Sequence, residues 1–254
     1  MILIRRIAII FSIIVIGGLF EFLLWKPEWY YVFISLLEIL IISLLFWLSW
    51  KKIEIKEACS LIITPFFFLG FSFVFIFFME GSLLEQLVIL TIVFLWWTFI
   101  ENVFLFFYQP VRYQPYSLEN ITSYLNLITV FLVSSSLHSF IIFLGFSGAL
   151  SLLLIFLITL LLVLQMIVIN KISIKKNFGL IITLALMIAE LFWVTKFLPS
   201  SYLVNGLIIA ISYYLLTGII SHWFLESLDK KVLKRYLGIS GTLFLLIVLS
   251  ARWI

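Results

Sequence analysis

The chain has 254 residues, of which 65% are hydrophobic, 19% are aromatic and only 11% are charged. Soluble domains carry roughly 25% charged residues and rarely expose large apolar patches, so this composition excludes an ordinary soluble fold. The net charge of +4 does not indicate nucleic-acid binding, because the basic residues lie in small clusters between apolar runs. The single cysteine, Cys59, excludes an intramolecular disulfide and a multi-cysteine zinc site.

Long apolar runs divide the sequence from one end to the other. A bilayer core requires roughly 20 apolar residues of helix, and runs of this length without apolar–polar alternation are not barrel strands. The sequence therefore predicts an all-α fold, a polytopic transmembrane helix bundle that forms a single integral membrane domain over residues 1–254. In chain order, the nine predicted spans are 7–25, 29–50, 60–79, 83–107, 119–144, 147–169, 178–198, 201–223 and 236–253.

The distribution of Lys and Arg predicts the orientation of these spans. With the N-terminus inside, only Lys26, Lys196 and Arg252 of the 16 Lys and Arg residues fall on the outer side. Cytoplasmic loops of membrane proteins carry such an excess of positive charge. We expect the N-terminus inside, the C-terminus outside and an uncleaved first span. The short loops fit a multi-pass protein of the cell membrane, typically the cytoplasmic membrane of a prokaryote.

An internal repeat is predicted from two cytoplasmic loops. Residues 52–64 read KIEIKEACSLIIT and residues 171–183 read KISIKKNFGLIIT, and eight of the thirteen positions are identical. The offset predicts a parallel repeat of four plus four helices, with an extra helix at the end. The corresponding ranges are 1–117, 118–236 and 237–254. The alternative is a chance match between two segments rich in Ile, Leu and Lys.

Four ionisable residues are expected at membrane depth. Such groups are costly in lipid and usually face a protein interior or a cavity. No Lys or Arg is expected at a comparable depth to neutralise the three glutamates. Each residue is a candidate for coupling to a proton or cation, and the alternative is a neutral hydrogen bond between helices. These candidates are Glu38, Glu101, His138 and Glu190.

The segment that joins the fourth and fifth predicted spans is the most unusual part of the sequence. It contains Tyr-Gln-Pro twice, at 108–110 and 113–115, on either side of Arg112. Proline ends helices, and Ser117 suits the N-cap of the next one, so the segment predicts an ordered interfacial turn. The functional alternative is a substrate or headgroup site, since Arg112 can bind a phosphate or carboxylate with two hydrogen bonds. The candidate binding residues are Glu101, Asn102, Arg112, Tyr113, Gln114, Glu119, Asn120 and Asn126.

The sequence leaves the biochemical activity open. It contains no Walker loop and no dinucleotide-binding glycine motif, and Glu101, His138 and His222 lack the spacing of metal ligands, so no cofactor or metal is expected. The leading hypothesis is a carrier for a small solute or lipid. The alternatives are a non-catalytic scaffold in a membrane complex and an enzyme acting on a lipid-linked substrate at the cytoplasmic face. The expected partners are membrane lipids and, for the scaffold, another protein.

Overall fold

A computed structural model describes residues 2–50, 52–224 and 226–251 of the chain. Within these ranges the regular secondary structure is entirely helical, and nine helices are long and apolar enough to cross a membrane. The prediction of a nine-span helical bundle is therefore confirmed. The helices are α1 (Ile2–Trp25), α2 (Tyr30–Ser49), α3 (Ile55–Phe77), α4 (Ser82–Tyr108), α5 (Ser117–Leu144), α6 (Gly148–Ile169), α7 (Ile174–Thr195), α8 (Tyr202–Phe224) and α9 (Lys230–Ser250), and a short 3-10 helix (Pro27–Trp29) precedes α2.

Several helices begin one turn or more before the apolar run that predicted them. The predicted starts at residues 7, 60, 178 and 236 become Ile2, Ile55, Ile174 and Lys230 in the structure. Hydropathy marks the length that fits in hydrocarbon, whereas the helix continues through polar residues as long as its backbone groups are paired. The start of α9 shows this directly, because the Asp229 side chain accepts a hydrogen bond of 2.7 Å from the Val232 amide.

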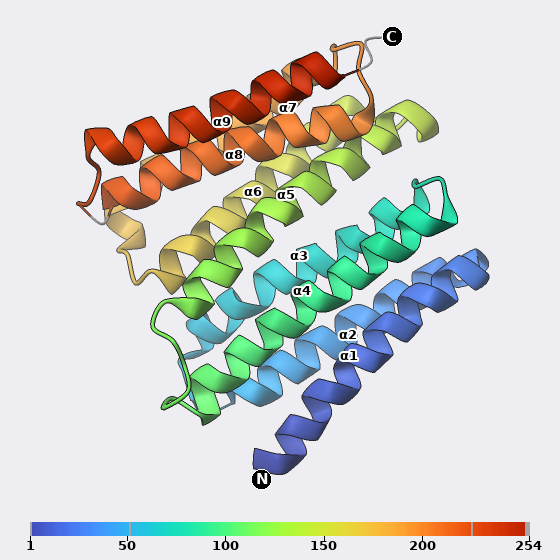
Figure 1. The fold of residues 1–254 in the computed structure, drawn as a ribbon, viewed down its shortest axis with the longest axis vertical. Helices are drawn as coiled ribbons and strands as arrows, with labels where there is room; N and C mark the ends of the chain where they lie inside the picture. The colour runs from blue at the N-terminus through green and yellow to red at the C-terminus, as the bar shows by residue number, and fades with distance from the viewer. Residues whose placement is uncertain (1, 51, 225, 252–254) are drawn as a thin grey trace. The chain divides into compact units, whose positions relative to one another are not determined.

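The chain forms two compact units, residues 1–126 and residues 127–254. In the first unit, α1 and α3 each pack against both α2 and α4, which closes the four helices into a bundle. These are the blue to green helices of Figure 1. Their core is aromatic: the Phe20 and Phe73 rings lie 4.5 Å apart, and Trp96 is completely buried. In lipid, tight van der Waals packing of this kind holds helices together.

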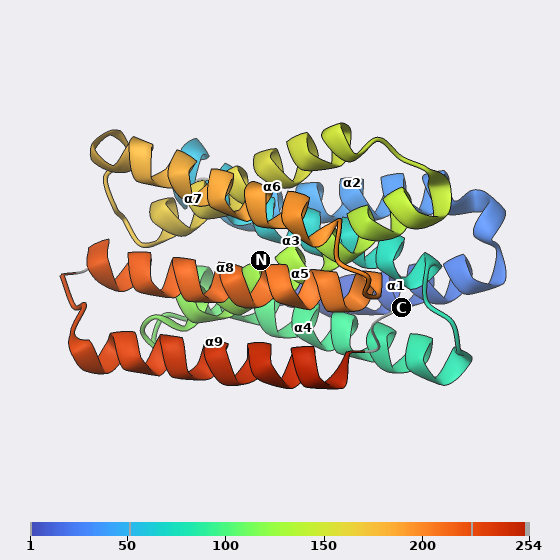
Figure 2. The same ribbon diagram turned by 90° about the horizontal axis from the view of Figure 1, so that it is seen from above.

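In the second unit the helices α6 to α9 pack in sequence order, each against the next. Figure 2 shows α8 lying between α7 and α9. Small residues join α5 to α8, where the Ser134 hydroxyl lies 3.4 Å from the Gly206 carbonyl oxygen. In α9, by contrast, Ser240 is the only buried residue, so most of this helix surface faces away from the protein.

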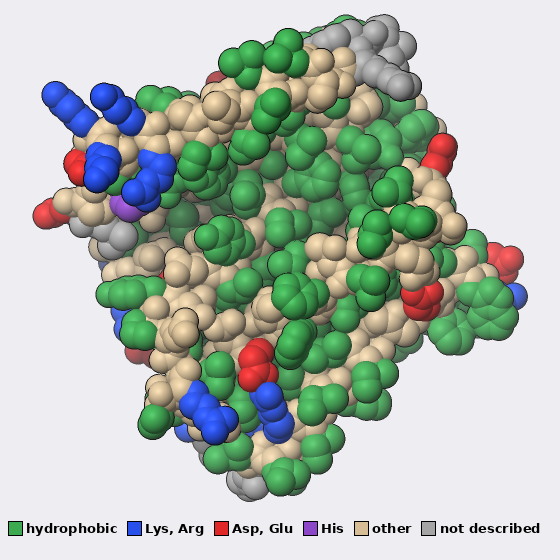
Figure 3. All heavy atoms as spheres, in the orientation of Figure 1, with side chains coloured by type: hydrophobic (Ala, Val, Ile, Leu, Met, Phe, Trp, Pro, Cys, Tyr) green, Lys and Arg blue, Asp and Glu red, His purple; other side chains and the backbone are tan. Residues whose placement is uncertain are grey.

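Basic side chains gather at one end of the helices in each unit. Figure 3 shows them over the end of the first unit where α1 begins, and on the second unit beside the start of α9. In the first unit, the antiparallel helices bring together Arg5 and Arg6 from α1, Lys52 after α2, and Arg112 after α4. This is the distribution on which the orientation prediction rests, and the orientation itself stays a prediction.

Candidate functional site

The first turns of α1, the last turns of α4 and the turn after α4 line an open cavity in the first unit. Its volume is about 580 Å³, which is within the range of small-molecule pockets. Hydrocarbon side chains form part of the wall, and two arginines, a carboxylate and an amide form the rest. The lining residues are Ile2, Leu3, Arg6, Glu101, Phe104, Leu105, Gln109 and Arg112.

An ion pair between Arg6 and Glu101 crosses this cavity from α1 to α4. The Arg6 guanidinium donates to the Glu101 carboxylate and also lies 5.3 Å from the centre of the Phe104 ring. The expectation that no basic residue reaches the depth of Glu101 is therefore wrong. Helix α1 continues through Arg6 instead of starting after it, and the long arginine side chain reaches the carboxylate. Glu101 is thus neutralised by a partner 95 residues away in the sequence.

Beside the cavity, Tyr108 holds the end of α4 against α1 and α2. Its hydroxyl donates a hydrogen bond of 2.6 Å to the Leu48 carbonyl oxygen. The Arg5 guanidinium lies 4.3 Å from the centre of its ring, and the Lys52 ammonium lies 5.3 Å from it. Cations over an aromatic face are stabilised by the ring quadrupole. Arg5 and Lys52 are therefore held at the Tyr108 ring, and from there they add positive charge next to the cavity.

Arg112 is the basic residue of the cavity that remains available to a ligand. A turn after α4 positions it, in which the Arg112 amide donates a 2.9 Å hydrogen bond to the Gln109 carbonyl oxygen. The side chain is exposed, and no ion pair joins it to another residue in the described part of the chain. The predicted candidates Glu101 and Arg112 thus do line one cavity, and Arg6 and Gln109 complete it.

Other predicted binding residues close the α4–α5 connection. The Ser117 hydroxyl donates to the Asn102 side-chain oxygen, and the Asn102 amide nitrogen donates to the Thr98 carbonyl oxygen over 2.7 Å. The prediction of Ser117 as N-cap is wrong, because α5 begins at Ser117 itself and the serine hydroxyl points to α4. Asn102 therefore has a structural role in the connection.

Tyr113 supplies the cap that Ser117 does not. Its hydroxyl oxygen accepts a 3.0 Å hydrogen bond from the Leu118 amide, and the hydroxyl lies 3.3 Å from a Glu119 carboxylate oxygen. One of the unpaired amides at the start of α5 is thereby satisfied. Burial raises the pKa of Tyr113 above its usual value, and the adjacent Glu119 carboxylate raises it further.

We expect Tyr113→Phe to lower the free energy of unfolding by about 1 kcal/mol, because it removes the partner of the Leu118 amide. The raised pKa favours the neutral phenol in the folded state, so its contribution is complete below about pH 10 and is lost as the pH rises further. Unfolding of the purified protein in detergent, followed between pH 7 and 11, measures both effects. The exposed Tyr124→Phe is the control, and equal losses in both variants would contradict the capping role.

The remaining binding candidates do not reach the cavity. Asn126 is buried in the first unit, where its side-chain oxygen accepts a 2.7 Å hydrogen bond from the Thr64 hydroxyl. Gln114 and Asn120 are exposed. The Gln114 carbonyl oxygen accepts a backbone hydrogen bond within the turn, and the Asn120 amide donates one in the first turn of α5. The eight candidates thus divide between a cavity, a helix connection and a buried helix contact.

The other ionisable residues at membrane depth lie in three different environments. His138 is buried in the second unit, where Nδ1 lies 2.8 Å from the Ser134 carbonyl oxygen and Nε2 lies 3.2 Å from the Thr195 hydroxyl. These contacts satisfy a neutral imidazole and support a structural role. Glu190 is exposed on α7, close to its C-terminal end. Glu38 lines a separate groove between α2 and α3.

Sequence reasoning missed Arg6 and Gln109 as site residues. Arg5 and Arg6 counted only as orientation signals, and Gln109 only as part of a turn repeat. A signal was present in the sequence. Arg6 and Glu101 carry opposite charges, and both lie near the predicted cytoplasmic end of a span. Their pairing nevertheless required knowledge that α1 packs against α4. In the described part of the chain, no group of three His, Cys, Asp or Glu side chains is arranged to hold a metal ion.

Comparison with known proteins gives a family. Residues 10–250 match the family described as "Protein of unknown function (DUF5656)". No curated protein and no solved structure matches the chain. The match covers nearly all of the helical region and extends over both units.

Proposed function

The chain belongs to the DUF5656 family, and we propose that it is a carrier for a small solute or lipid that binds an anionic headgroup at the cytoplasmic end of its first unit. The observation that carries this proposal is the cavity of about 580 Å³ lined by Arg6, Gln109 and Arg112 beside Ile2 and Leu3. A phosphate or carboxylate group fits the polar wall. A hydrocarbon chain fits the apolar wall.

The charges around the cavity favour an anion. Arg112 has no ion-pair partner in the described ranges, and Glu101 is the acidic residue of the lining. The planar guanidinium of Arg112 can donate two parallel hydrogen bonds to a phosphate. Arg5 and Lys52, held at Tyr108, add to the positive potential that attracts anionic lipid. Glu101 meanwhile neutralises Arg6 and so limits the affinity for the anion, as a carrier requires for release.

The proposal includes the predicted arrangement in the membrane. An N-terminus inside places the cavity at the cytoplasmic leaflet of the cell membrane, where anionic headgroups are available. The proposal also includes the predicted parallel repeats of residues 1–117 and 118–236, because relative movement of repeats is the way in which carriers of this kind expose a site to each side of the membrane. The repeat stays part of the proposal and is supported by the match between residues 52–64 and 171–183.

Two substitutions in the cavity should change anion binding in opposite directions. We expect Arg112→Gln to weaken the binding of phosphatidylglycerol about tenfold, because it removes the available guanidinium. Glu101→Gln should instead strengthen binding, since it releases Arg6 to the anion. Native mass spectrometry of the protein in phosphatidylcholine nanodiscs doped with phosphatidylglycerol measures both. Arg235→Gln on α9 is the control, since it removes the same charge from the second unit.

The carrier step needs a separate measurement. Vesicles that contain the protein should move headgroup-labelled phosphatidylglycerol between leaflets faster than protein-free vesicles, and Arg112→Gln should abolish the difference. Binding of phosphatidylglycerol without movement between leaflets would reject the carrier and favour a lipid-binding scaffold. A second polypeptide that copurifies at a fixed ratio would support the scaffold. The enzyme would be favoured if the wild type chemically converts the lipid and both Arg112→Gln and Glu101→Gln abolish this conversion. Equal binding by wild type and Arg112→Gln would reject the site.

A further inference from the structure

A second cavity in the first unit lies at membrane depth, away from the cavity of Arg6 and Arg112. It is a groove of about 510 Å³ between α2 and α3. Glu38 lies about 12 Å along α2 from Tyr30 at 1.5 Å per residue, which is near the middle of the span. Apart from the Glu38 carboxyl group and Ser35, the wall is hydrocarbon and aromatic. The lining residues are Ile34, Ser35, Glu38, Ile39, Phe66, Phe67, Gly70, Phe71 and Val74.

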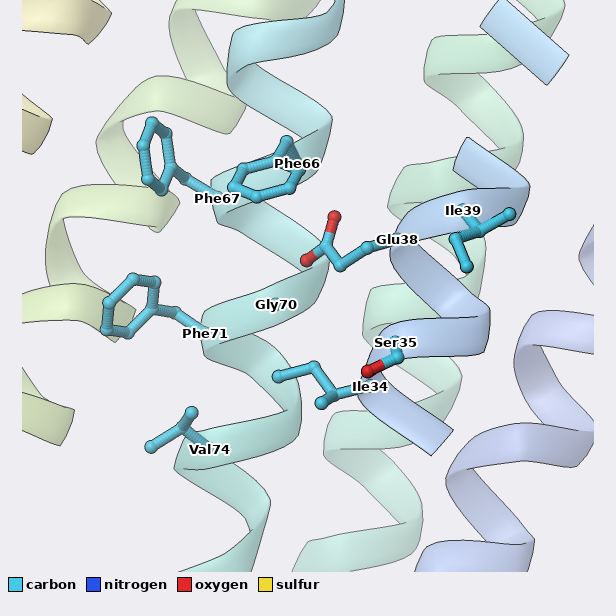
Figure 4. Close-up of a pocket in the computed structure, with 9 residues that line it drawn as sticks. All are labelled: Ile34, Ser35, Glu38, Ile39, Phe66, Phe67, Gly70, Phe71 and Val74. Carbon is cyan, nitrogen blue, oxygen red and sulfur yellow. The ribbon is translucent and has the colours of Figure 1, made fainter. Parts of the chain in front are cut away.

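The Glu38 side chain crosses the groove toward α3. Figure 4 shows its carboxyl group beside Gly70, with the Phe66 ring next to it. A side chain at position 70 would place its Cβ 2.5 Å from Glu38 Oε1, so the carboxyl group occupies space that glycine leaves open. The pairing of Glu38 with Gly70 thus positions an acidic group between two helices.

The carboxyl group of Glu38 is not satisfied by the protein around it. Its Oε2 atom is buried and has no hydrogen-bond partner in the described part of the chain. The neighbouring Ser35 hydroxyl donates its proton to the Tyr31 carbonyl oxygen over 2.7 Å and does not donate it to Glu38. In the described ranges, no Lys or Arg forms an ion pair with Glu38, whereas Glu101 is paired with Arg6. Buried polar atoms without a partner are rare in proteins, and a donor or a cation from outside the protein would satisfy this one.

We propose that this groove binds a lipophilic organic cation, an ammonium or phosphonium that carries apolar groups. The Glu38 carboxylate supplies the countercharge, and the phenylalanine rings of α3 provide π faces and apolar contact. The volume of about 510 Å³ suits a small molecule. The open side of the groove is lined by residues such as Ile39, which is 64% exposed, so a ligand dissolved in the bilayer reaches it directly.

The proposal is tested by equilibrium binding of radiolabelled tetraphenylphosphonium to the full-length protein. Nanodiscs of phosphatidylcholine are used, because anionic lipids would collect the cation without the protein. We expect saturable binding to the wild type and a dissociation constant at least about tenfold higher in Glu38→Gln, which keeps the shape and removes the charge. Gly70→Ala should weaken binding as well, since its methyl group displaces the carboxyl group.

The control is Glu190→Gln, which removes an exposed carboxylate from α7 and should leave the affinity unchanged. Absence of saturable binding to the wild type overturns the proposal, and so does equal binding by Glu38→Gln and the wild type. If Glu38→Gln does not fold, Gly70→Ala and displacement of the label by dodecylamine decide the question. These outcomes do not depend on Arg112, so failure here is distinguishable from failure of the anionic-lipid site.

Discussion

Gly206→Leu is expected to destabilise the second unit more than a comparable substitution on the outer surface of that unit. A Cβ atom at position 206 would lie 3.1 Å from both the Ser135 Cβ and the Ser135 backbone nitrogen. Backbone cannot move aside as a flexible side chain can, so α5 and α8 must separate. Overpacking of a tight core costs roughly 1–3 kcal/mol, and here it also removes the contact between Ser134 and the Gly206 carbonyl oxygen.

The measurement is the unfolding midpoint of the purified protein in mixed micelles with increasing dodecyl sulfate. The control is Gly179→Leu on α7, where a Cβ meets no atom within 4 Å. Both variants replace a helical glycine by leucine, so the gain in helix propensity is shared and cancels in the comparison. If Gly179→Leu were as destabilising as Gly206→Leu, the close approach of α5 and α8 would not be the cause.

Trp96→Ala is expected to have the largest effect in the first unit. Trp96 is completely buried, and its indole nitrogen donates a 3.3 Å hydrogen bond from α4 to the Ser12 hydroxyl of α1. Its removal leaves a cavity between these helices, for which a cost of about 3–5 kcal/mol is typical. The same two helices bring Arg6 to Glu101, so the anion cavity should lose its shape as well.

The neighbouring Trp97→Ala is the matched control, because Trp97 is 46% exposed and leaves no comparable void. Unfolding in dodecyl sulfate gives the stability change, and phosphatidylglycerol binding in nanodiscs gives the effect on the cavity. We expect Trp96→Ala to reduce both, and Trp97→Ala to change neither by much. Weak lipid binding in a Trp96→Ala protein of unchanged stability would contradict the packing explanation.

The sequence alone determined the number of helices and the place of most of their ends. Each span needs about 20 apolar residues regardless of what surrounds it, so hydropathy is sufficient to count spans. The starts of α1, α3, α7 and α9 were placed too late, because charged residues near these helix starts separate the first residues from the apolar runs. The repeated Tyr-Gln-Pro motif and the rarity of ionisable residues inside spans indicated Arg112 and Glu101, which the structure places around one cavity.

Only the tertiary structure decided which faces of the helices meet. In lipid the outward face of a helix is as apolar as its buried face, so the sequence carries little periodicity from which to predict rotation. Arg6 therefore could not be assigned to Glu101, nor Glu38 to Gly70, nor Thr64 to Asn126. Each of these pairs joins different helices and depends on packing between them. Composition determined that this chain belongs in a membrane, and helix packing decided which of its few polar groups are paired with one another.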